Sequence, residues 1–395
     1  MELYHEQYRP QVHFTSRRGW LNDPNGLVYY GGEYHLFYQH NPYGWDWGNM
    51  HWGHAVSADL VHWEELPIAL YPDELGTCFS GSAVVDWEDS AGFQSGSEKA
   101  LVAIYTAAGE PFTQCLAYSN DRGRTWSKYE GNPVLGHIAG DNRDPKVIWY
   151  QPERKWVMAL YLEGEDFALF SSPDLKDWDK LCDVRVEGCS ECPEFFALPL
   201  DGDVERQRWV FYGGNGSYLI GDFDGKIFAA ESGPHRMHCA CTRSGDAFYA
   251  SQTFNEEPAG RRVVIGWARG TEMPGMPFNQ MMNFPCELTL RTTAEGPRLF
   301  VQPVDEVERL YGKREAITGA GVLQIGDVCD VEVECALRGA QQVGLHVRGI
   351  PVSYHMGAKR LSCLGCSAPL EAREGKVKLR AIVDRTSIEI FANDG

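Results

Sequence analysis

The sequence lacks any apolar run near the roughly 20 residues that a membrane-spanning helix requires. Residues 1–5 also lack the basic and apolar regions of a signal peptide. We therefore expect no membrane partner. We expect the protein to be cytoplasmic, or secreted with a leader that has already been removed.

Positive charge is also scarce. The chain of 395 residues holds 55 acidic and 36 basic side chains, which gives a formal net charge of −19. Such a surface repels phosphate backbones and anionic lipids, so the charge argues against nucleic acid or a membrane as partner. A neutral ligand remains compatible with it, and the oligomeric state stays open.

The 12 cysteines are too sparse for a disulfide scaffold, which is short and dense in cysteine. Most are expected to be small buried side chains. Ligand-like spacings occur in His51-x-x-His54, His235-x-x-His238 with Cys239 and Cys241, Cys189-x-x-Cys192 and Cys363-x-x-Cys366. None has the helical context of a His-Glu-x-x-His site, and strand periodicity sends neighbouring side chains to different faces. A metalloprotein is therefore an alternative, but we expect no metal and no cofactor.

Long stretches of 3.6-residue hydrophobic periodicity are missing, and short β-rich runs dominate from residue 10 to about 300. The 42 glycines and 12% aromatic residues suit many short strands joined by tight turns. We predict an all-β fold. Residues 27–40, two β-rich runs around Gly31-Gly32, predict a hairpin.

One turn pattern recurs along the chain. A Ser-x-Asp turn follows a β-rich run and leads to a tryptophan, at intervals of about 50 to 60 residues. The copies start at Ser57, Ser119 and Ser172, and the tryptophans are Trp63, Trp126 and Trp178. A repeat of this length predicts propeller blades of about four strands, with these tryptophans in the blade core. Three unrelated aspartate turns are the alternative.

The residue pattern changes near residue 300. Pro303, acidic residues and Val/Leu at helical spacing predict a short connecting helix. Later segments alternate polar and apolar residues as in a β-sandwich; they are residues 331–337, 342–347 and 387–391. We expect this second domain to be cut short, because the chain stops at an Asn-Asp-Gly turn with no partner strand. The expected domains are a propeller at 1–300, a linker at 301–312 and the sandwich at 313–395.

Three acids stand in unusual settings. Asp23 enters a Pro-Asn-Gly turn, where a stiff loop is expected to hold its carboxylate at the entry to a sheet. Asp144 has an adjacent arginine and a nearby lysine, which favour its ionised form, and the following proline favours extended backbone. Glu191 has apolar or weakly polar neighbours, so partial burial would raise its pKa. An ionised and a protonated carboxyl together suit the cleavage of a glycosidic bond.

A sugar platform is expected near these acids. Aromatic faces stack on the C–H surfaces of sugars, while amides and hydroxyls bond sugar oxygens. The candidates are Trp45, Trp47, Asn49, Trp52 and residues 79–82. Among the tryptophans, Trp47 is favoured for the site because its neighbours are polar residues and glycine.

Six segments resemble, in order, the signature blocks of glycoside hydrolase family 32, which contains invertases, inulinases and levanases. The segments are residues 20–26, 47–55, 79–82, 143–145, 191–193 and 384–391. The resemblance spans nearly the whole chain. It implies a five-bladed β-propeller followed by a β-sandwich.

The resemblance also implies a retaining hydrolase of β-fructofuranosyl linkages, with Asp23 as nucleophile, Glu191 as acid/base and Asp144 as the residue that steadies the transition state. The implied fructose-pocket residues are Asn22, Gln39, Trp47, Asn49, Phe79, Ser80, Arg143 and Trp267. Residues 270–288 lack the Trp-Arg-Gly usual in invertases, which favours levan or inulin, with sucrose as a further candidate. A fructosyltransferase on the same scaffold and a non-catalytic sugar-binding propeller are the alternatives.

Overall fold

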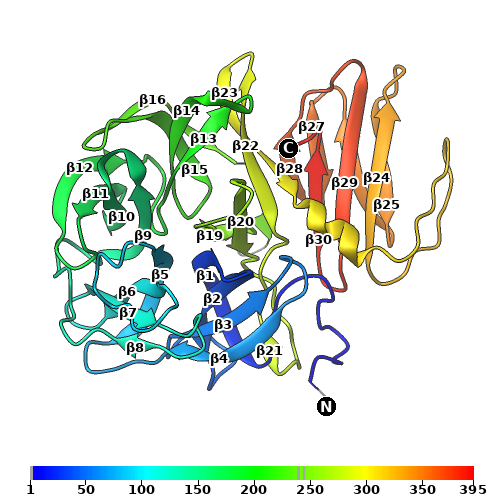
Figure 1. The fold of residues 1–395 in the computed structure, drawn as a ribbon. Helices are drawn as coiled ribbons and strands as arrows, with labels where there is room; N and C mark the ends of the chain where they lie inside the picture. Colours follow the sequence, from blue (N-terminus) through cyan, green and yellow to red (C-terminus); the bar gives the residue numbers. More distant parts are fainter. Residues whose placement is uncertain (1–2, 238–240, 243–244) are drawn as a thin grey trace.

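The computed structural model describes residues 3–237, 241–242 and 245–395. Its ordered structure is almost entirely β, as expected, and forms a five-bladed β-propeller followed by a β-sandwich (Figure 1). None of the helices within the described ranges is long and apolar enough to cross a membrane.

Each blade of the described propeller has four antiparallel strands. Blade I contains β1 (Gly19–Tyr30), β2 (Glu33–Asn41), β3 (His51–Ser57) and β4 (Glu64–Leu70), and blade II contains β5 (Thr77–Asp86), β6 (Ala100–Ala108), β7 (Thr113–Ser119) and β8 (Ser127–Lys128). Blade III contains β9 (Arg143–Tyr150), β10 (Lys155–Glu163), β11 (Asp166–Ser172) and β12 (Asp179–Arg185). Blade IV contains β13 (Glu194–Leu200), β14 (Asp203–Tyr212), β15 (Ser217–Phe223) and β16 (Phe228–Arg236). Blade V contains β19 (Tyr249–Thr253), β20 (Arg262–Trp267), β22 (Cys286–Thr293) and β23 (Gly296–Pro303).

The first strand of each blade lies at the centre of the propeller, where β1, β5, β9, β13 and β19 meet (Figure 1). Smaller elements complete the described structure: η1 (Gln151–Glu153), the pair β17 (Cys241–Thr242) and β18 (Gly245–Asp246), and β21 (Phe278–Asn279), which joins β1 in parallel. This arrangement brings residues from distant parts of the sequence to one central region.

The predicted hairpin at residues 27–40 is confirmed, since β1 pairs with β2 around Gly31-Gly32. The predicted loop and turn at Asp23 are wrong, because Asp23 lies within the continuous strand β1. Register shifts on either side of Pro24 act as bulges, so the strand accommodates the proline and the positive φ of Gly26 without ending. A Cβ at Gly26 would lie 2.6 Å from the Phe37 ring, so glycine is also needed there for space.

The predicted repeat is confirmed. In the copy after β7, Ser119 Oγ donates to Asp121 Oδ1 at 2.7 Å, and the copies after β3 and β11 form the same hydrogen bond. The residue after each aspartate adopts a positive φ. The tryptophans Trp63, Trp126 and Trp178 pack against the hydrophobic clusters of the blades, as predicted.

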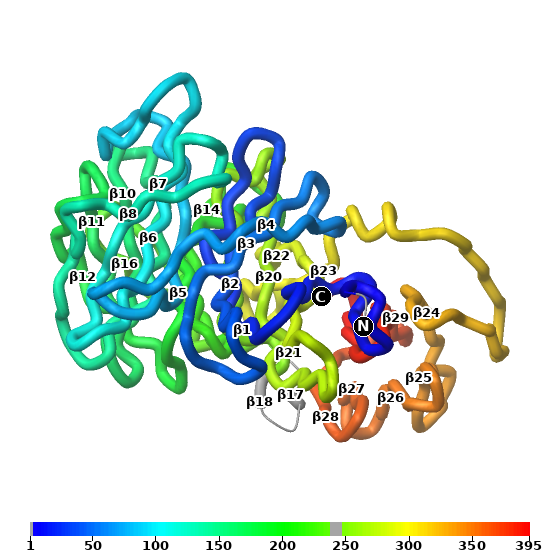
Figure 2. The backbone as a smooth tube through the Cα atoms, turned by 90° about the horizontal axis from the view of Figure 1, so that it is seen from below, coloured from blue at the N-terminus to red at the C-terminus, as the bar shows by residue number. Residues whose placement is uncertain are grey.

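The predicted connecting helix is present as the 3-10 helix η2 (Asp305–Leu310). One sheet of the sandwich contains β24 (Cys329–Ala336), β29 (Lys376–Val383) and β30 (Ile388–Ala392). The other contains β25 (Gln342–Val347), β26 (Ile350–His355), β27 (Arg360–Cys363) and β28 (Cys366–Pro369). Figure 2 shows the segment before β1 beside this sandwich, and we propose 1–300, 301–312 and 313–395 as the limits of propeller, linker and sandwich.

Candidate active site

The three acids lie at the starts of three blades. Asp23 is in β1, Asp144 is the second residue of β9, and Glu191 precedes β13. All three line one cavity of about 170 Å³. The complete lining is Asn22, Asp23, Gln39, Trp47, Phe79, Ser80, Arg143, Asp144, Glu191, Tyr249, Trp267 and Arg269.

Hydrogen bonds fix the carboxylate of Asp23. Its Oδ2 accepts a bond from Ser80 Oγ at 2.7 Å, and its Oδ1 accepts one from Asn22 Nδ2 at 2.9 Å. The Oδ1 of Asn22 in turn accepts from Trp20 Nε1 at 2.8 Å. The sheet and these neighbours therefore orient Asp23, where a stiff turn had been expected.

Asp144 is buried, and its surroundings differ from the expectation in two ways. Burial raises its pKa to about 7, although the charge of Arg143 acts in the opposite direction. Arg143 favours the ionised form, as predicted, but burial outweighs it, and the nearby lysine, Lys146, pairs with Glu194 instead. The predicted extended backbone is wrong, because Asp144 has a φ of 63° while its N–H donates to Thr106 Oγ1 at 3.0 Å.

Glu191 is more open to solvent than Asp144. Burial raises the pKa of Glu191, as expected; Asp23 adds to that rise, whereas Arg143 and Arg269 lower it. An Nη atom of Arg143 lies 3.5 Å from Glu191 Oε1, and Nε of Arg143 lies 3.7 Å from Asp144 Oδ2. One arginine thus bridges the two acids.

Cys192 lies between two of the acids. Its Sγ is 3.5 Å from Asp144 Oδ2 and 3.7 Å from Asp23 Oδ2, and its N–H donates to Asp144 Oδ2 at 3.0 Å. Burial raises the pKa of this thiol well above its usual value, so the thiol is neutral and donates to the carboxylates. Positive φ angles at Glu191 and Cys192 turn the chain here, and backbone strain of this kind is common at functional sites.

Two of the ligand-like spacings place their side chains on different partners. His51 Nδ1 contacts the Asn49 carbonyl, whereas His54 Nε2 contacts His35, so the two imidazoles have different partners. The thiol of Cys189 donates to the Ser190 carbonyl, away from the partners of Cys192. Asp144, Glu191 and Cys192 do have ligand atoms within 4.8 Å of one another, and they are the three residues whose ligand atoms meet among the described part of the chain.

The other two ligand-like spacings are Cys363-x-x-Cys366 and the group that begins at His235. Cys363 and Cys366 are cross-strand partners in the β27–β28 hairpin. His235 contacts Ser232, whereas His238 and Cys239 lie outside the described residues and the side chain of Cys241 is not described.

The sugar-platform candidates separate into two groups. Trp47 is 57% exposed at the cavity rim, next to Phe79, whereas Trp52 is fully buried and its Nε1 donates to the Phe79 carbonyl. Trp45 donates to the Phe278 carbonyl and does not line the cavity. The platform role is therefore wrong for Trp52, which is a core residue. Asn49 is exposed and is not among the lining residues, unlike the other fructose-pocket residues that the resemblance implied.

Sequence reasoning missed two lining residues, Tyr249 and Arg269. The guanidinium carbon of Arg269 lies 4.6 Å from the ring centroid of Tyr249 and 5.7 Å from that of Trp267. Arg269 lies in the turn after β20, two residues beyond Trp267, and its closeness to that tryptophan in the sequence is the signal that could have found it. Tyr249 faces Trp267 across the β19–β20 ladder, and this pairing has no local signal in the sequence.

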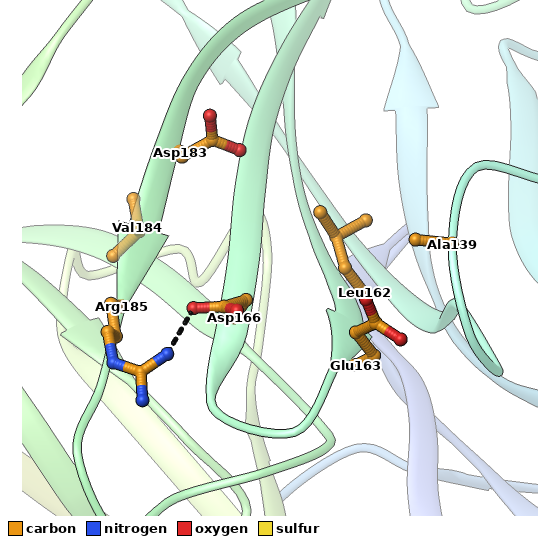
Figure 3. Close-up of a pocket in the computed structure, with 7 residues that line it drawn as sticks. All are labelled: Ala139, Leu162, Glu163, Asp166, Asp183, Val184 and Arg185. Atoms are coloured by element: carbon orange, nitrogen blue, oxygen red, sulfur yellow. Dashed lines mark hydrogen bonds and ion pairs between the residues drawn. The ribbon is translucent and has the colours of Figure 1, made fainter.

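A second cavity, of about 380 Å³, lies on blade III (Figure 3). One of its acidic lining residues, Asp166, accepts a hydrogen bond from Arg185 at 2.8 Å. The cavity contains none of the predicted site residues; its lining is Ala139, Leu162, Glu163, Asp166, Asp183, Val184 and Arg185.

Two family models match the chain. The glycosyl hydrolases family 32 N-terminal domain matches residues 13–303, and the family 32 C-terminal model matches residues 306–395. The chain belongs to glycosyl hydrolases family 32. The family resemblance read from the six signature segments is thereby confirmed.

Curated relatives within family 32 carry several names. A levanase of Bacillus subtilis is 43% identical over 99% of this chain and 66% of its own length. An invertase of Schizosaccharomyces pombe is 38% identical over 74% of this chain and 55% of its own length. The chain spans slightly less than two thirds of the B. subtilis levanase and about half, 48%, of a levanase from Bacillus sp. strain L7.

Solved structures of family 32 share the fold. The exo-inulinase from Aspergillus awamori superposes with a TM-score of 0.89 at 29% identity, covering 99% of this chain and 92% of the other. The fructofuranosidase from Schwanniomyces occidentalis, complexed with fructose, gives a TM-score of 0.86 at 27% identity, covering 99% and 91%. These matches agree with the propeller and sandwich described above.

Proposed function

We propose that this chain is a retaining glycoside hydrolase that cleaves β-fructofuranosyl linkages in levan or inulin, and in sucrose, and releases fructose. The observation that carries the proposal is the meeting of Asp23, Asp144 and Glu191 in one cavity, with Arg143 between two of them. The names of the relatives, levanase, invertase and exo-inulinase, support the same substrates.

In the first step, Asp23 attacks the anomeric C2 of the fructofuranosyl unit while Glu191 gives its proton to the departing glycosidic oxygen. Burial raises the pKa of Glu191, which favours the protonated form that this step requires. In the second step, the same Glu191 takes a proton from water, which attacks C2, frees fructose and restores Asp23. The scheme needs the two carboxyl groups to be ~5–5.5 Å apart.

The cavity floor suits a single polyol ring. Asn22, Gln39 and Ser80 are each at most 6% exposed and offer amide and hydroxyl groups to sugar hydroxyls. Asp144 holds fructose hydroxyls and steadies the charge that develops on the ring in the transition state. Asn49 does not line the cavity, and we propose it only as a contact of the bound sugar.

Chromatography of the early products from levan, inulin and sucrose tests this proposal. We expect fructose from all three. Oligomers would indicate internal cleavage, and cyclic or lengthened products would indicate fructosyl transfer, which the covalent intermediate also permits. Failure to release any sugar would favour the sugar-binding alternative and overturn the proposal.

The chemistry has its own test. Polarimetry of the first-formed fructose should report retained configuration, and inversion would exclude Asp23 as nucleophile. Asp23→Asn keeps the size of the side chain and should lower kcat by at least about 1,000-fold with the fold intact. Substantial residual turnover in that variant would contradict the nucleophile role.

A further inference from the structure

The floor and the rim of the catalytic cavity differ in chemistry. The floor residue Gln39 is 2% exposed, whereas Trp47 on the rim is 57% exposed. A terminal fructosyl unit on the polar floor leaves the rest of a fructan chain to cross the rim. The side chains beyond the rim therefore decide how a longer substrate is held.

Three aromatic rings contact one another in sequence, beginning at this rim. The ring centroids of Trp47 and Phe79 are 5.9 Å apart with an interplanar angle of 75°, and those of Phe79 and Phe112 are 5.5 Å apart with an angle of 76°. Trp47 and Phe79 line the cavity, but Phe112 does not. Phe112 lies in the loop between β6 and β7 and is half-buried. The three rings therefore form a chain of edge-to-face contacts that begins at the cavity lining and ends at Phe112 on blade II.

Buried hydrogen bonds anchor the chain next to Phe112. Gln114, two residues later in β7, is fully buried; its Oε1 accepts from Thr106 Oγ1 at 2.7 Å and its Nε2 donates to the Asn142 carbonyl at 3.2 Å. The N–H of Gln114 donates to the Leu135 carbonyl at 2.8 Å. An aromatic ring on such a fixed support loses little conformational entropy when it binds a ligand.

We propose that Phe112, together with Trp47 and Phe79, forms a binding subsite for the second and third sugar units of a β-fructan chain on the leaving-group side of Glu191. The inference rests on the proposed function, because the terminal fructosyl unit must first occupy the cavity. Aromatic rings stack on the C–H faces of sugars regardless of linkage, so the line of rings serves a polymer. The second sugar of sucrose ends at Trp47 and Phe79, and only a longer chain reaches Phe112.

The test compares substrates of different length in Phe112→Leu and Phe112→Ala. Leucine keeps an apolar group against Phe79 but removes the aromatic face. The matched control is Trp87→Leu. Trp87 is 50% exposed and follows the end of β5, whereas Phe79 lies near the start of that strand. Values of kcat/KM are measured with sucrose, a fructosyl trisaccharide, inulin and levan. We expect Phe112→Leu to lower kcat/KM for inulin or levan by about 3- to 10-fold, mainly through KM. Sucrose should change less than about twofold, and Trp87→Leu should change neither substrate.

The outcomes separate the two proposals. Equal losses on sucrose and polymer would make Phe112 a packing support of Phe79 and overturn the subsite, as would an unchanged polymer value. If the unmodified protein releases fructose from none of the substrates, the proposed function itself fails. A second readout needs no turnover. The Kd of inulin oligosaccharides is measured by calorimetric titration for Asp23→Asn and for the double variant Asp23→Asn, Phe112→Leu. The double variant should bind about 3- to 10-fold more weakly, which is the factor expected for kcat/KM. An unchanged Kd would overturn the subsite.

Discussion

The ammonium nitrogen of Lys146 lies 2.9 Å from Oε1 of Glu194, and both side chains are at most 2% exposed. Lys146 follows Asp144 by two residues in β9, and Glu194 follows Glu191 by three residues and begins β13. Lys146 also donates to the Thr253 carbonyl at 2.7 Å, and Thr253 Oγ1 donates to Glu194 Oε2 at 2.6 Å. This network joins the inner strands of blades III, IV and V next to two of the acids.

Lys146→Met should destabilise the protein because it leaves the Glu194 carboxylate buried without its nearest counter-ion. Removing one partner of a buried pair costs about 3–5 kcal/mol, which urea unfolding would measure. The double variant Lys146→Met, Glu194→Gln removes both charges and should recover part of this loss. A single variant as stable as the unmodified protein would show that the pair does not hold these strands together.

Asp144→Asn should raise stability at alkaline pH. Burial raises the pKa of Asp144 to about 7, above the usual value of about 3.8, so the folded state binds this proton more tightly than the unfolded state. The corresponding stability is present below pH ~4 and is lost as pH rises through about 7. At pH 8 the amide should therefore stabilise the fold by about 2–4 kcal/mol, with a smaller difference at pH 5. Thermal unfolding at both values tests this, and a gain confined to pH 5 would contradict it.

His13 connects the segment before β1 to the sandwich. Its Nδ1 lies 2.8 Å from Asp384 Oδ2, and its Nε2 lies 2.9 Å from Glu389 Oε1. Burial would lower the pKa of His13, but the two carboxylates outweigh this effect and raise it to about 9. Asp384 also accepts the N–H groups of Gln11 and Val12. The last of the six signature segments therefore forms the contact between the two ends of the chain.

His13→Gln should weaken this contact in a pH-dependent way. Because the folded pKa of His13 is raised, its contribution is fully present below pH ~6.5 and is lost as pH rises through about 9. We expect the variant to be roughly 2–3 kcal/mol less stable at pH 6.5 and nearly equal to the unmodified protein at pH 10. Urea unfolding at the two pH values measures the difference. A loss of the same size at both would mean that charge does not provide the stabilisation.

Local patterns were readable from the sequence because their partners are adjacent in the chain. The Ser119–Asp121 turn depends on residues two apart, and the Gly31-Gly32 hairpin depends on its own turn, so both were predicted correctly. The pKa of Asp144 depends on what other blades place around it. The sequence displays the adjacent Arg143, whereas the burial that outweighs it arises only when the blades close.

The same distinction explains the site residues. The signature segments name most of the cavity lining, although none reveals that Cys192 lies between Asp23 and Asp144. That position requires β1, β9 and the turn before β13 to meet at the centre of the propeller. Cys192 and Glu191 are neighbours in the sequence, whereas the contacts of Cys192 with the other two acids are long-range.

Arg269 provides a test of how the rim controls Glu191, the proposed acid/base group. Burial and Asp23 raise the pKa of Glu191, and the positive charges of Arg143 and Arg269 lower it. Arg269→Gln removes one of these charges, so the pKa of Glu191 should rise. Glu191 then keeps its proton to higher pH, and the alkaline limb of the kcat/KM profile should move upward.

Arg143 remains in place in this variant, so kcat/KM at neutral pH should change by less than about tenfold. Arg154→Gln is the matched control, since Arg154 is exposed on blade III and pairs only with Glu88 among the ion pairs described. The control should leave the alkaline limb unmoved. A limb that stays in place in Arg269→Gln, or moves downward, would mean that Glu191 is not the group whose deprotonation ends activity, because loss of the Arg269 charge should raise the pKa of Glu191.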